Sequence, residues 1–229
     1  MFHLLAKLFK KRTSKYSDIV PDYKEYTKLQ KETFCSFESQ NELWSKGQER
    51  YITKNFGRIN RSEVILDIAC GDGVGLREFK KLGFVNLIGV EFNHEKVKIA
   101  KKSGYPIYEH DMHDLSIFKN SMFDVIYSSH TIEHSYYPKK ALLELLRILK
   151  PNGKLYVVLP YPDNQKFNIK AHGAKFELGT HKRDDGRSIV DYFEKLGYSL
   201  IKKSYDSFRE PEIWLEFIKR RLDLEDKKY

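Results

Sequence analysis

Cysteine is nearly absent from this sequence. Only Cys35 and Cys70 occur in 229 residues, and their spacing matches neither a metal-ligand motif nor a disulfide framework. No apolar run approaches the roughly 20 residues that cross a bilayer, and no cleavage site follows the short apolar stretch at the start. These absences predict a protein of the reducing cytoplasm, without a signal peptide or a transmembrane helix.

A concentrated block of basic residues is also lacking, although the formal net charge is +9. Because the lysines are dispersed, a lysine-rich solvated surface is the ordinary explanation, and RNA, an anionic membrane or an acidic substrate are the alternatives. No DNA partner is expected. Residues 1–12 (MFHLLAKLFKKR) would form a basic amphipathic helix that packs on the domain or lies on a membrane surface. A peripheral position at the inner membrane surface is therefore the alternative location.

The most informative pattern is a strand, a glycine loop and a helix within residues 63–75 (EVILDIACGDGVG). The apolar, β-branched run at 64–68 is typical of a strand that is buried on both faces of a parallel sheet. Gly71, Gly73 and Gly75 then allow a sharp turn and the close approach of a ligand. This unit predicts a nucleotide-type site at the mouth of an α/β sheet.

Two carboxylates distinguish this loop from a dinucleotide site. The dinucleotide fingerprint is G-x-G-x-x-G. This loop instead reads G-x-G-x-G, and two carboxylates, Asp67 and Asp72, lie in or beside it. A pyrophosphate needs backbone N–H donors and a positive environment, so these anions would repel it. A ligand that carries an ammonium and a sulfonium would be attracted instead.

From residue 63 onward, apolar strands alternate with amphipathic helices. Strands are expected at 64–68, 86–91, 106–109, 123–128 and 154–159, and helices at 75–82, at 94–102, from about 138, and at 187–196. Repeated strand–helix units predict a parallel sheet with right-handed crossovers. The period-two segments 199–205 and 213–219 predict an antiparallel C-terminal hairpin. The fold class is therefore α/β, mostly parallel with an antiparallel C-terminal hairpin strand.

Three regions follow from this pattern. Residues 1–60 are polar and aromatic and are expected to form a helical N-terminal cap, with a helix or two between 38 and 56. Residues 61–229 form the main domain. Within it, residues 161–183 are glycine-rich and aperiodic, and are expected to form a loop over the carboxyl ends of the strands.

The motifs resemble those of class I S-adenosylmethionine-dependent methyltransferases. LDIACGDG at 66–73 resembles the first motif of this class. IGVEF at 88–92 resembles the end of its second strand, and HDMHDL at 110–115 resembles its third motif. FDVIYSSHTIEH at 123–134 resembles the fourth motif of the ubiquinone- and menaquinone-biosynthesis group of methyltransferases. ALLELLRILKPNGKLYVVLP at 141–160 is similar to the helix and fifth strand of that group. The resemblance implies a Rossmann-like doubly wound sheet and S-adenosylmethionine as the cofactor.

The same resemblance implies roles for individual residues. Glu91 would bind the ribose hydroxyls, Asp111 would accept a hydrogen bond from the adenine amino group, and Met112 would pack near the ring. The expected cofactor-binding residues are Asp67, Ala69, Gly71, Asp72, Gly73, Glu91, Phe92, Asp111, Met112 and Ser128.

Three polar residues follow the fourth expected strand: His130, Glu133 and His134. Methyl transfer requires an in-line approach of the acceptor, and an alcohol acceptor must also lose a proton to a base. His130 and His134 are the candidate catalytic residues. The alternatives are that His130 only lines the cofactor pocket and that Glu133 and His134 are structural.

A divalent metal would be another way to activate an acceptor hydroxyl. Some resembling O-methyltransferases hold one through a Glu-x-x-Glu-His motif and a later histidine, but His130 replaces the first Glu here. Such an imidazole-rich set suits a transition metal better than magnesium. No metal is expected, and the candidate ligands would be His130, Glu133, His134, His172 and His181.

The acceptor is expected to be a small molecule. An acceptor with an acidic group would be attracted by the basic side chains of the 161–183 loop. These side chains are Lys175, His181, Lys182, Arg183 and the neighbouring Arg187. Solvation of the loop is the alternative explanation. Tyr161 and the region of Trp44 are expected to line the acceptor pocket or to belong to the ordinary core.

The expected function is S-adenosylmethionine-dependent O-methylation (class EC 2.1.1.-) of a small molecule such as a sugar or a glycan precursor. A quinone-like lipid is the alternative that residues 1–12 favour. RNA or protein methylation is a further alternative, although SSHT at 128–131 replaces the N/D-P-P-Y/F motif of amino-directed nucleic-acid methyltransferases. A non-catalytic cofactor-binding partner module also stays open, as does the oligomeric state.

Overall fold

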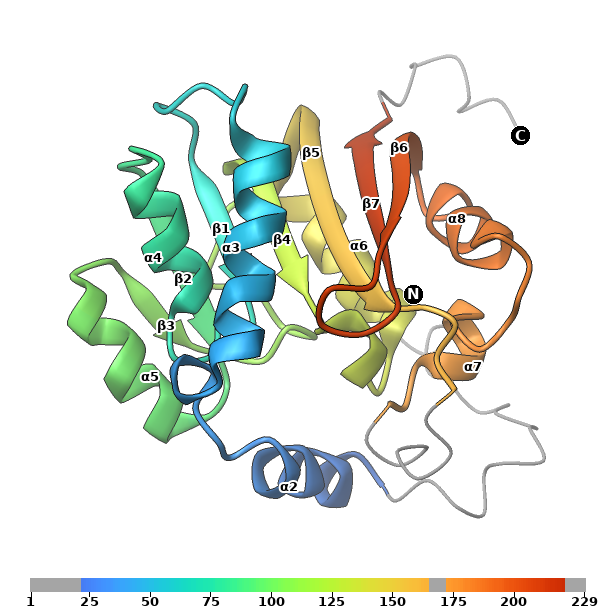
Figure 1. Ribbon diagram of the computed structural model, residues 1–229, viewed down its shortest axis with the longest axis horizontal. Helices are drawn as coiled ribbons and strands as arrows, with labels where there is room; N and C mark the ends of the chain where they lie inside the picture. Colours follow the sequence, from blue (N-terminus) through green and yellow to red (C-terminus); the bar gives the residue numbers. More distant parts are fainter. Residues whose placement is uncertain (1–21, 165–171, 221–229) are drawn as a thin grey trace, which may run out of the picture.

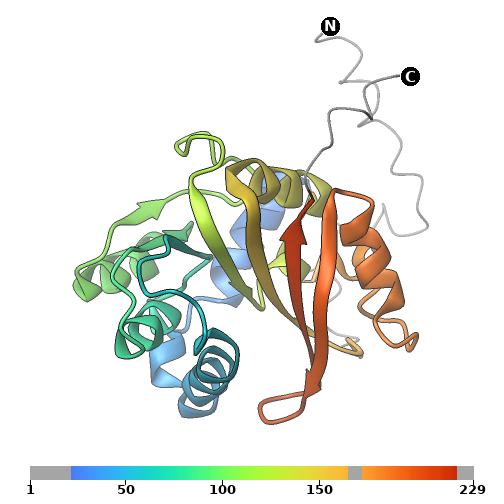
Figure 2. The same cartoon turned by 90° about the horizontal axis from the view of Figure 1, so that it is seen from above.

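The computed structural model describes residues 22–164 and 172–220. These residues form a seven-stranded sheet with helices on both faces (Figures 1 and 2). The strand order is β3-β2-β1-β4-β5-β7-β6. The predicted amphipathic segment 1–12 lies outside the described residues.

The sheet has a parallel part and an antiparallel part. The parallel strands are β1 (Ile65–Ile68), β2 (Leu87–Glu91), β3 (Ile107–Glu109), β4 (Phe123–Ser129) and β5 (Leu149–Pro160). β7 (Glu212–Lys219) lies between β5 and β6 (Tyr198–Asp206) and runs antiparallel to both. The predicted fold class and the antiparallel hairpin are confirmed. β5 begins at Leu149 rather than at 154, because Leu149 already pairs with Phe123 before a register shift.

The helices form two layers (Figure 2). One face of the sheet carries α3 (Glu42–Phe56), α4 (Val74–Lys81), α5 (His94–Ala100) and the short η2 (Lys101–Ser103). The other carries α6 (Pro138–Ile148) and α8 (Arg187–Glu194). In α6, Pro138 occupies the first turn, where no N–H is needed, and Leu142 and Leu145 are fully buried. This apolar stripe is what fixes the helix on the sheet.

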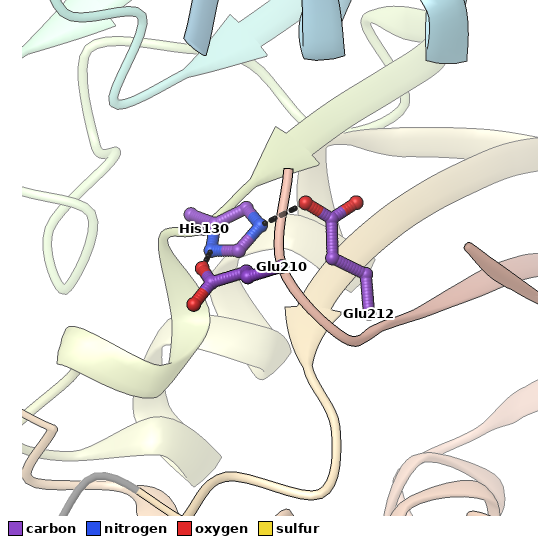
Figure 3. Close-up of side chains that lie close together, drawn as sticks. All are labelled: His130, Glu210 and Glu212. Atoms are coloured by element: carbon purple, nitrogen blue, oxygen red, sulfur yellow. Dashed lines mark hydrogen bonds and ion pairs between the residues drawn. The ribbon is translucent and has the colours of Figure 1, made fainter. Parts of the chain in front are cut away.

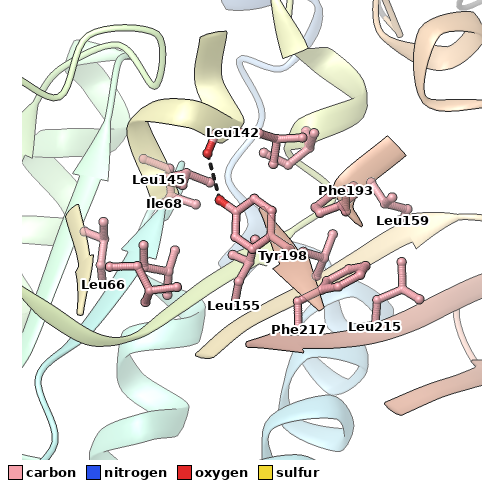
Figure 4. Close-up of a cluster of buried hydrophobic side chains, with 14 of the residues drawn as sticks. Leu66, Ile68, Leu142, Leu145, Leu155, Leu159, Phe193, Tyr198, Leu215 and Phe217 are labelled. Atoms are coloured by element: carbon pink, nitrogen blue, oxygen red, sulfur yellow. Dashed lines mark hydrogen bonds between the residues drawn. The ribbon is translucent and has the colours of Figure 1, made fainter. Parts of the chain in front are cut away.

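The larger core cluster lies between the sheet and the α6/α8 layer (Figure 4). Tyr198 at the start of β6 is buried there, and its hydroxyl donates a 2.7 Å hydrogen bond to the carbonyl of Leu142. The rings of Phe193 and Phe217 stack at 4.6 Å beside it. The C-terminal hairpin is therefore part of the main core and not an appendage.

Two helices near the carboxyl ends of the strands, α2 (Tyr23–Thr33) and α7 (Lys175–Leu178), were not predicted from the sequence. α2 begins after Asp22, whose side chain accepts a hydrogen bond from the N–H of Glu25, and lies across the ends of the strands (Figure 1). Only Tyr26 and Gln30 are buried in it. The 161–183 segment contains α7, while η1 (Glu38–Gln40) and η3 (Ile132–His134) are single turns. The boundary at residue 60 stays a prediction.

Candidate active site

The glycine loop connects β1 to α4 with a backbone that side chains do not easily adopt. Gly71 and Gly73 have φ angles of +55° and +86°, in the left-handed region that favours glycine. A Cβ on Gly71 would also lie 2.5 Å from a carboxylate oxygen of Glu38. The glycines are therefore needed both for the turn and for the close approach of η1.

Three carboxylates converge on this loop. Asp67 at the end of β1 is 4% exposed, and its Oδ2 has no hydrogen-bond partner in the described part of the chain. Burial raises the pKa of Asp67 well above its usual value, and the negative charges of Glu91 and Glu38 raise it further. Lys96 pairs with Glu38. The loop is thus electrostatically suited to a cationic ligand.

Glu91 ends β2 directly below the loop. One of its oxygens accepts a 3.0 Å hydrogen bond from the N–H of Gly71, and the other accepts from the N–H groups of Phe92 and Asn93 at 2.9 and 2.8 Å. Burial is the largest influence and raises the pKa of Glu91, although these hydrogen bonds oppose it. The carboxylate is therefore fixed in orientation beside the loop.

Asp111 lies at the other end of the site, after β3. It accepts hydrogen bonds from the backbone N–H of His113 at 2.9 Å and from the hydroxyl of Tyr23 in α2, and its Oδ1 is 2.5 Å from Nδ1 of His113. Burial would raise the pKa of Asp111, but these partners outweigh it and hold the pKa at about 2. Sequence reasoning missed Tyr23 and His113, because the contact of Tyr23 depends on how α2 packs.

A cavity of about 460 Å³ connects the glycine loop with the end of β4. A smaller one of about 40 Å³ lies beside Asp111 and Met112. The predicted residues Ala69, Gly71, Glu91, Phe92, Met112, His130, His134 and His172 all line the larger cavity. Other parts of its wall come from Phe34, Phe37, Glu38, Leu43, Trp44, Lys96, Thr131, Arg209 and Glu210.

Four predicted cofactor residues do not line either cavity: Asp67, Asp72, Gly73 and Ser128. The Oδ2 atom of Asp72 accepts hydrogen bonds from the N–H (3.1 Å) and hydroxyl of Ser39, so this carboxylate attaches the cap to the loop. Ser128 is fully buried in β4, and Ser129 lines the cavity in its place. Their roles as cofactor ligands remain predictions.

His130 lies directly after β4 with a φ of +50°, and carboxylates surround its ring. Nε2 is 3.2 Å from Glu212, and Nδ1 is 3.4 Å from both Glu133 and Glu210. Burial and the charge of Arg209 lower the pKa of His130, but the hydrogen bonds to Glu133 and Glu212 outweigh them and raise it. The ring is therefore favoured as an imidazolium.

Figure 3 shows His130 between Glu210, which comes from the β6–β7 turn, and Glu212, which begins β7. One ligand atom from each of these three residues lies within 4.8 Å of the others, the spacing of a metal site. However, Nε of Arg209 is 2.6 Å from Glu212, so that carboxylate already has a cationic partner. The expectation that no metal binds here stays a prediction.

Among the candidate metal ligands, His130, Glu133, His134 and His172 lie close together, whereas His181 does not. Glu133 is fully buried, and one of its oxygens lies 3.4 Å from Nδ1 of His130 and 3.8 Å from Nε2 of His134. The rings of His134 and His172 meet edge to face at 4.7 Å. His181 instead lies against the carbonyl of Lys175 and does not line the described cavities.

The basic side chains of the 161–183 region do not line these cavities either. Lys175 is buried and pairs with Asp163 at 3.2 Å, and Lys182 donates to Ser188 at 3.0 Å. The lysine and arginine side chains that do line the larger cavity are Lys96 and Arg209. Arg209, Glu210 and Glu212 gave no sequence signal, because only the tertiary fold brings the hairpin turn to this site.

Comparison with known proteins identifies the family of this chain. Residues 66–157 match the family model described as "Methyltransferase domain". An uncharacterised protein of Methanocaldococcus jannaschii is 30% identical over 142 residues, which cover 60% of this chain and 67% of that protein. This chain belongs to the class I S-adenosylmethionine-dependent methyltransferase family.

Other members of the class are more distant. The demethylmenaquinone methyltransferase of Renibacterium salmoninarum is 28% identical, covering 53% of this chain and 52% of that protein. The sterol 24-C-methyltransferase of Pneumocystis carinii is 28% identical over 64% of this chain and 41% of that protein. The chain thus spans only about half the length of these curated relatives.

Solved methyltransferases share the fold. The Burkholderia thailandensis 1,6-didemethyltoxoflavin-N1-methyltransferase, solved with S-adenosylhomocysteine, superposes with a TM-score of 0.63 at 12% identity, covering 89% of this chain and 92% of that one. At this identity the likeness concerns the fold alone. In this methyltransferase, the described residues include no helix of the length and apolarity that crossing a membrane requires.

Proposed function

We propose that this chain transfers the methyl group of S-adenosylmethionine to a hydroxyl group of a small molecule bound in the larger cavity. The observation that carries the proposal is the excess of carboxylates at the glycine loop, where Asp67 has an unpaired, buried oxygen next to Glu91 and Glu38. The cofactor's sulfonium and ammonium groups would balance this charge and provide an electrophilic methyl group.

The residues fit this cofactor from end to end. Asp67 and the loop backbone would receive the amino-acid end, Glu91 the ribose hydroxyls, and Asp111 with Met112 the adenine. Asp111 is restrained by His113 and Tyr23, so its orientation would be set before the cofactor binds. This division of roles follows the order of the strands along the edge of the sheet.

The remaining wall of the cavity would select the acceptor. Phe34, Phe37 and Trp44 provide aromatic surfaces, and His130 and Glu210 provide polar groups. Aromatic faces beside hydrogen-bonding groups suit a sugar or a glycan precursor, which is the acceptor that we propose first. The same faces suit a quinone-like lipid, and the similarity to a demethylmenaquinone methyltransferase favours this second candidate.

Transfer of a tritiated methyl group into a fractionated lysate of the source organism tests the proposal. We expect label in the small-molecule glycan-precursor or lipid fraction, and about tenfold less with Asp67→Asn at the same subsaturating cofactor concentration. Label confined to RNA or protein would overturn the proposed acceptor class. Cofactor binding without transfer to any fraction, together with a stable stoichiometric partner, would indicate a non-catalytic module.

A further inference from the structure

Asp163 and His172 form a buried pair at the wall of the larger cavity. Asp163 follows β5 and is 2% exposed, and His172 precedes α7 and is 6% exposed. Oδ2 of Asp163 lies 2.8 Å from Nδ1 of His172. Because an ionised carboxylate can only accept hydrogen bonds, this contact places a proton on Nδ1 and leaves the lone pair of the neutral ring on Nε2.

The carboxylate of Asp163 is held in its charged form. Its other oxygen accepts a 3.2 Å hydrogen bond from Nζ of the buried Lys175, and its backbone N–H donates to the carbonyl of Thr180 at 2.8 Å. Burial would raise the pKa of Asp163, but the interactions with His172 and Lys175 outweigh it and lower the pKa.

His172 lines the cavity that also contains the glycine loop. The next residue, Gly173, donates its N–H to the hydroxyl of Tyr26 at 3.0 Å, which anchors the segment to α2. Within residues 22–164 and 172–220, no hydrogen bond engages Nε2 of His172. The titratable groups around the ring are Asp163, Lys175, Glu133, His134 and Tyr26.

His130, the base that the sequence analysis favoured, has a different environment. Carboxylates face both of its ring nitrogens, so an imidazolium that donates on both sides satisfies the arrangement. A ring in that state has no lone pair for a substrate proton. His172 has a carboxylate on one nitrogen only, which is the arrangement that orients a histidine as a general base.

We infer that Asp163 and His172 are a catalytic pair, in which Nε2 of His172 removes the proton of the acceptor hydroxyl. The inference rests on the proposed O-methyl transfer. As the acceptor oxygen forms its bond to the methyl carbon, its proton passes to Nε2, and the carbon–sulfur bond breaks with its electron pair remaining on the sulfur. The imidazolium, stabilised by Asp163, then releases the proton to water.

The test compares the full-length wild type with His172→Asn, Asp163→Asn and the matched control His94→Asn. His94 also pairs with a carboxylate, Glu109 at 2.8 Å, but on the surface. The affinity for S-adenosylmethionine is measured by titration calorimetry, and kcat as a function of pH is measured with the acceptor fraction that takes up label from the wild type. Circular dichroism verifies folding.

We expect His172→Asn to lower kcat on the order of 10²-fold without weakening cofactor binding, and to abolish the acidic limb of the pH profile. Asp163→Asn should also lower kcat, although this variant still has the imidazole of His172. Added imidazole should partly restore His172→Gly. An unchanged pH profile in folded His172→Asn would overturn this inference alone, whereas no transfer by the wild type would overturn the proposed function and this inference with it.

Discussion

At the scale of the residue, the site is a set of carboxylates with few cations to balance them. Asp67, Glu91 and Glu38 converge at the glycine loop, and Lys96 pairs only with Glu38. Such an arrangement is costly without a ligand, since buried anions repel one another. The unfavourable electrostatics of the free loop are therefore what would make a cationic cofactor bind tightly.

Asp67→Asn removes one of these anions. We expect the affinity for S-adenosylmethionine to fall about tenfold or more, because the cation loses a buried partner. Since burial raises the pKa of Asp67, cofactor binding by the wild type should tighten as pH rises and this carboxyl ionises, and the variant should lose that dependence. Titration calorimetry measures both, with the exposed Glu95→Gln as the control. Equal affinities would refute the assigned role.

Chelation tests the cluster of His130, Glu210 and Glu212. Because Arg209 already pairs with Glu212 at 2.6 Å, we expect methyl transfer to persist after treatment with EDTA and passage over a chelating resin. Bound metal is measured by mass spectrometry on the same sample. Loss of activity that is recovered by adding one divalent metal would show that these side chains rearrange around an ion.

At the scale of the element, two segments that are remote in the chain close the site. α2 provides Tyr23 and Tyr26, while the β6–β7 turn provides Arg209 and Glu210. The guanidinium of Arg209 lies 4.0 Å from the centre of the Trp44 ring, which joins α3 to the hairpin. On the proposed function, the strands would position the cofactor residues, and the helices and the turn would form the acceptor wall.

Tyr26→Phe tests how α2 is attached. The hydroxyl donates to the carbonyl of His134 at 2.8 Å and accepts from the N–H of Gly173 at 3.0 Å. Its loss should lower the free energy of unfolding by about 1–3 kcal/mol and speed hydrogen exchange in α2 and around Gly173. Urea unfolding and exchange mass spectrometry measure these effects, with the half-exposed Tyr108→Phe as the control. Unchanged exchange would mean that other contacts hold α2.

At the scale of the whole molecule, the sequence predicted the parts of the site that depend on local pattern. The strand–glycine–helix unit identified Asp67 and Gly71, and the end of the second strand identified Glu91. Tyr23, Glu38, Asp163 and Glu212 were not identified as site residues, because nothing near them in the sequence resembles a motif. Their positions are set by packing between segments far apart in the chain, and that packing is not encoded in any short window.

The free energy of unfolding should vary with pH through the His130 and Glu212 pair. The folded pKa of His130 is raised above its usual 6.5. The stability that His130 contributes is therefore complete below pH 6.5 and is lost as pH rises through the folded pKa. The pKa of Glu212 is lowered from 4.5 to about 2; burial opposes this shift, and His130 and Arg209 cause it. Its contribution is therefore complete above 4.5 and lost as pH falls.

Urea unfolding across the pH range should then show the greatest contribution of this pair between 4.5 and 6.5. His130→Gln should remove the decline on the alkaline side while the rest of the curve keeps its shape. An identical decline in the variant would assign the effect to other groups.

The contact between Arg209 and Trp44 has a consequence for how the site is assembled during synthesis. The glycine loop and the first four strands leave the ribosome well before the β6–β7 turn does. A nascent chain can therefore acquire the cofactor half of the site while Trp44 still lacks its partner. On the proposed function, methyl transfer to the acceptor would await the arrival of the hairpin, and the last folding step would be the one that confers selectivity.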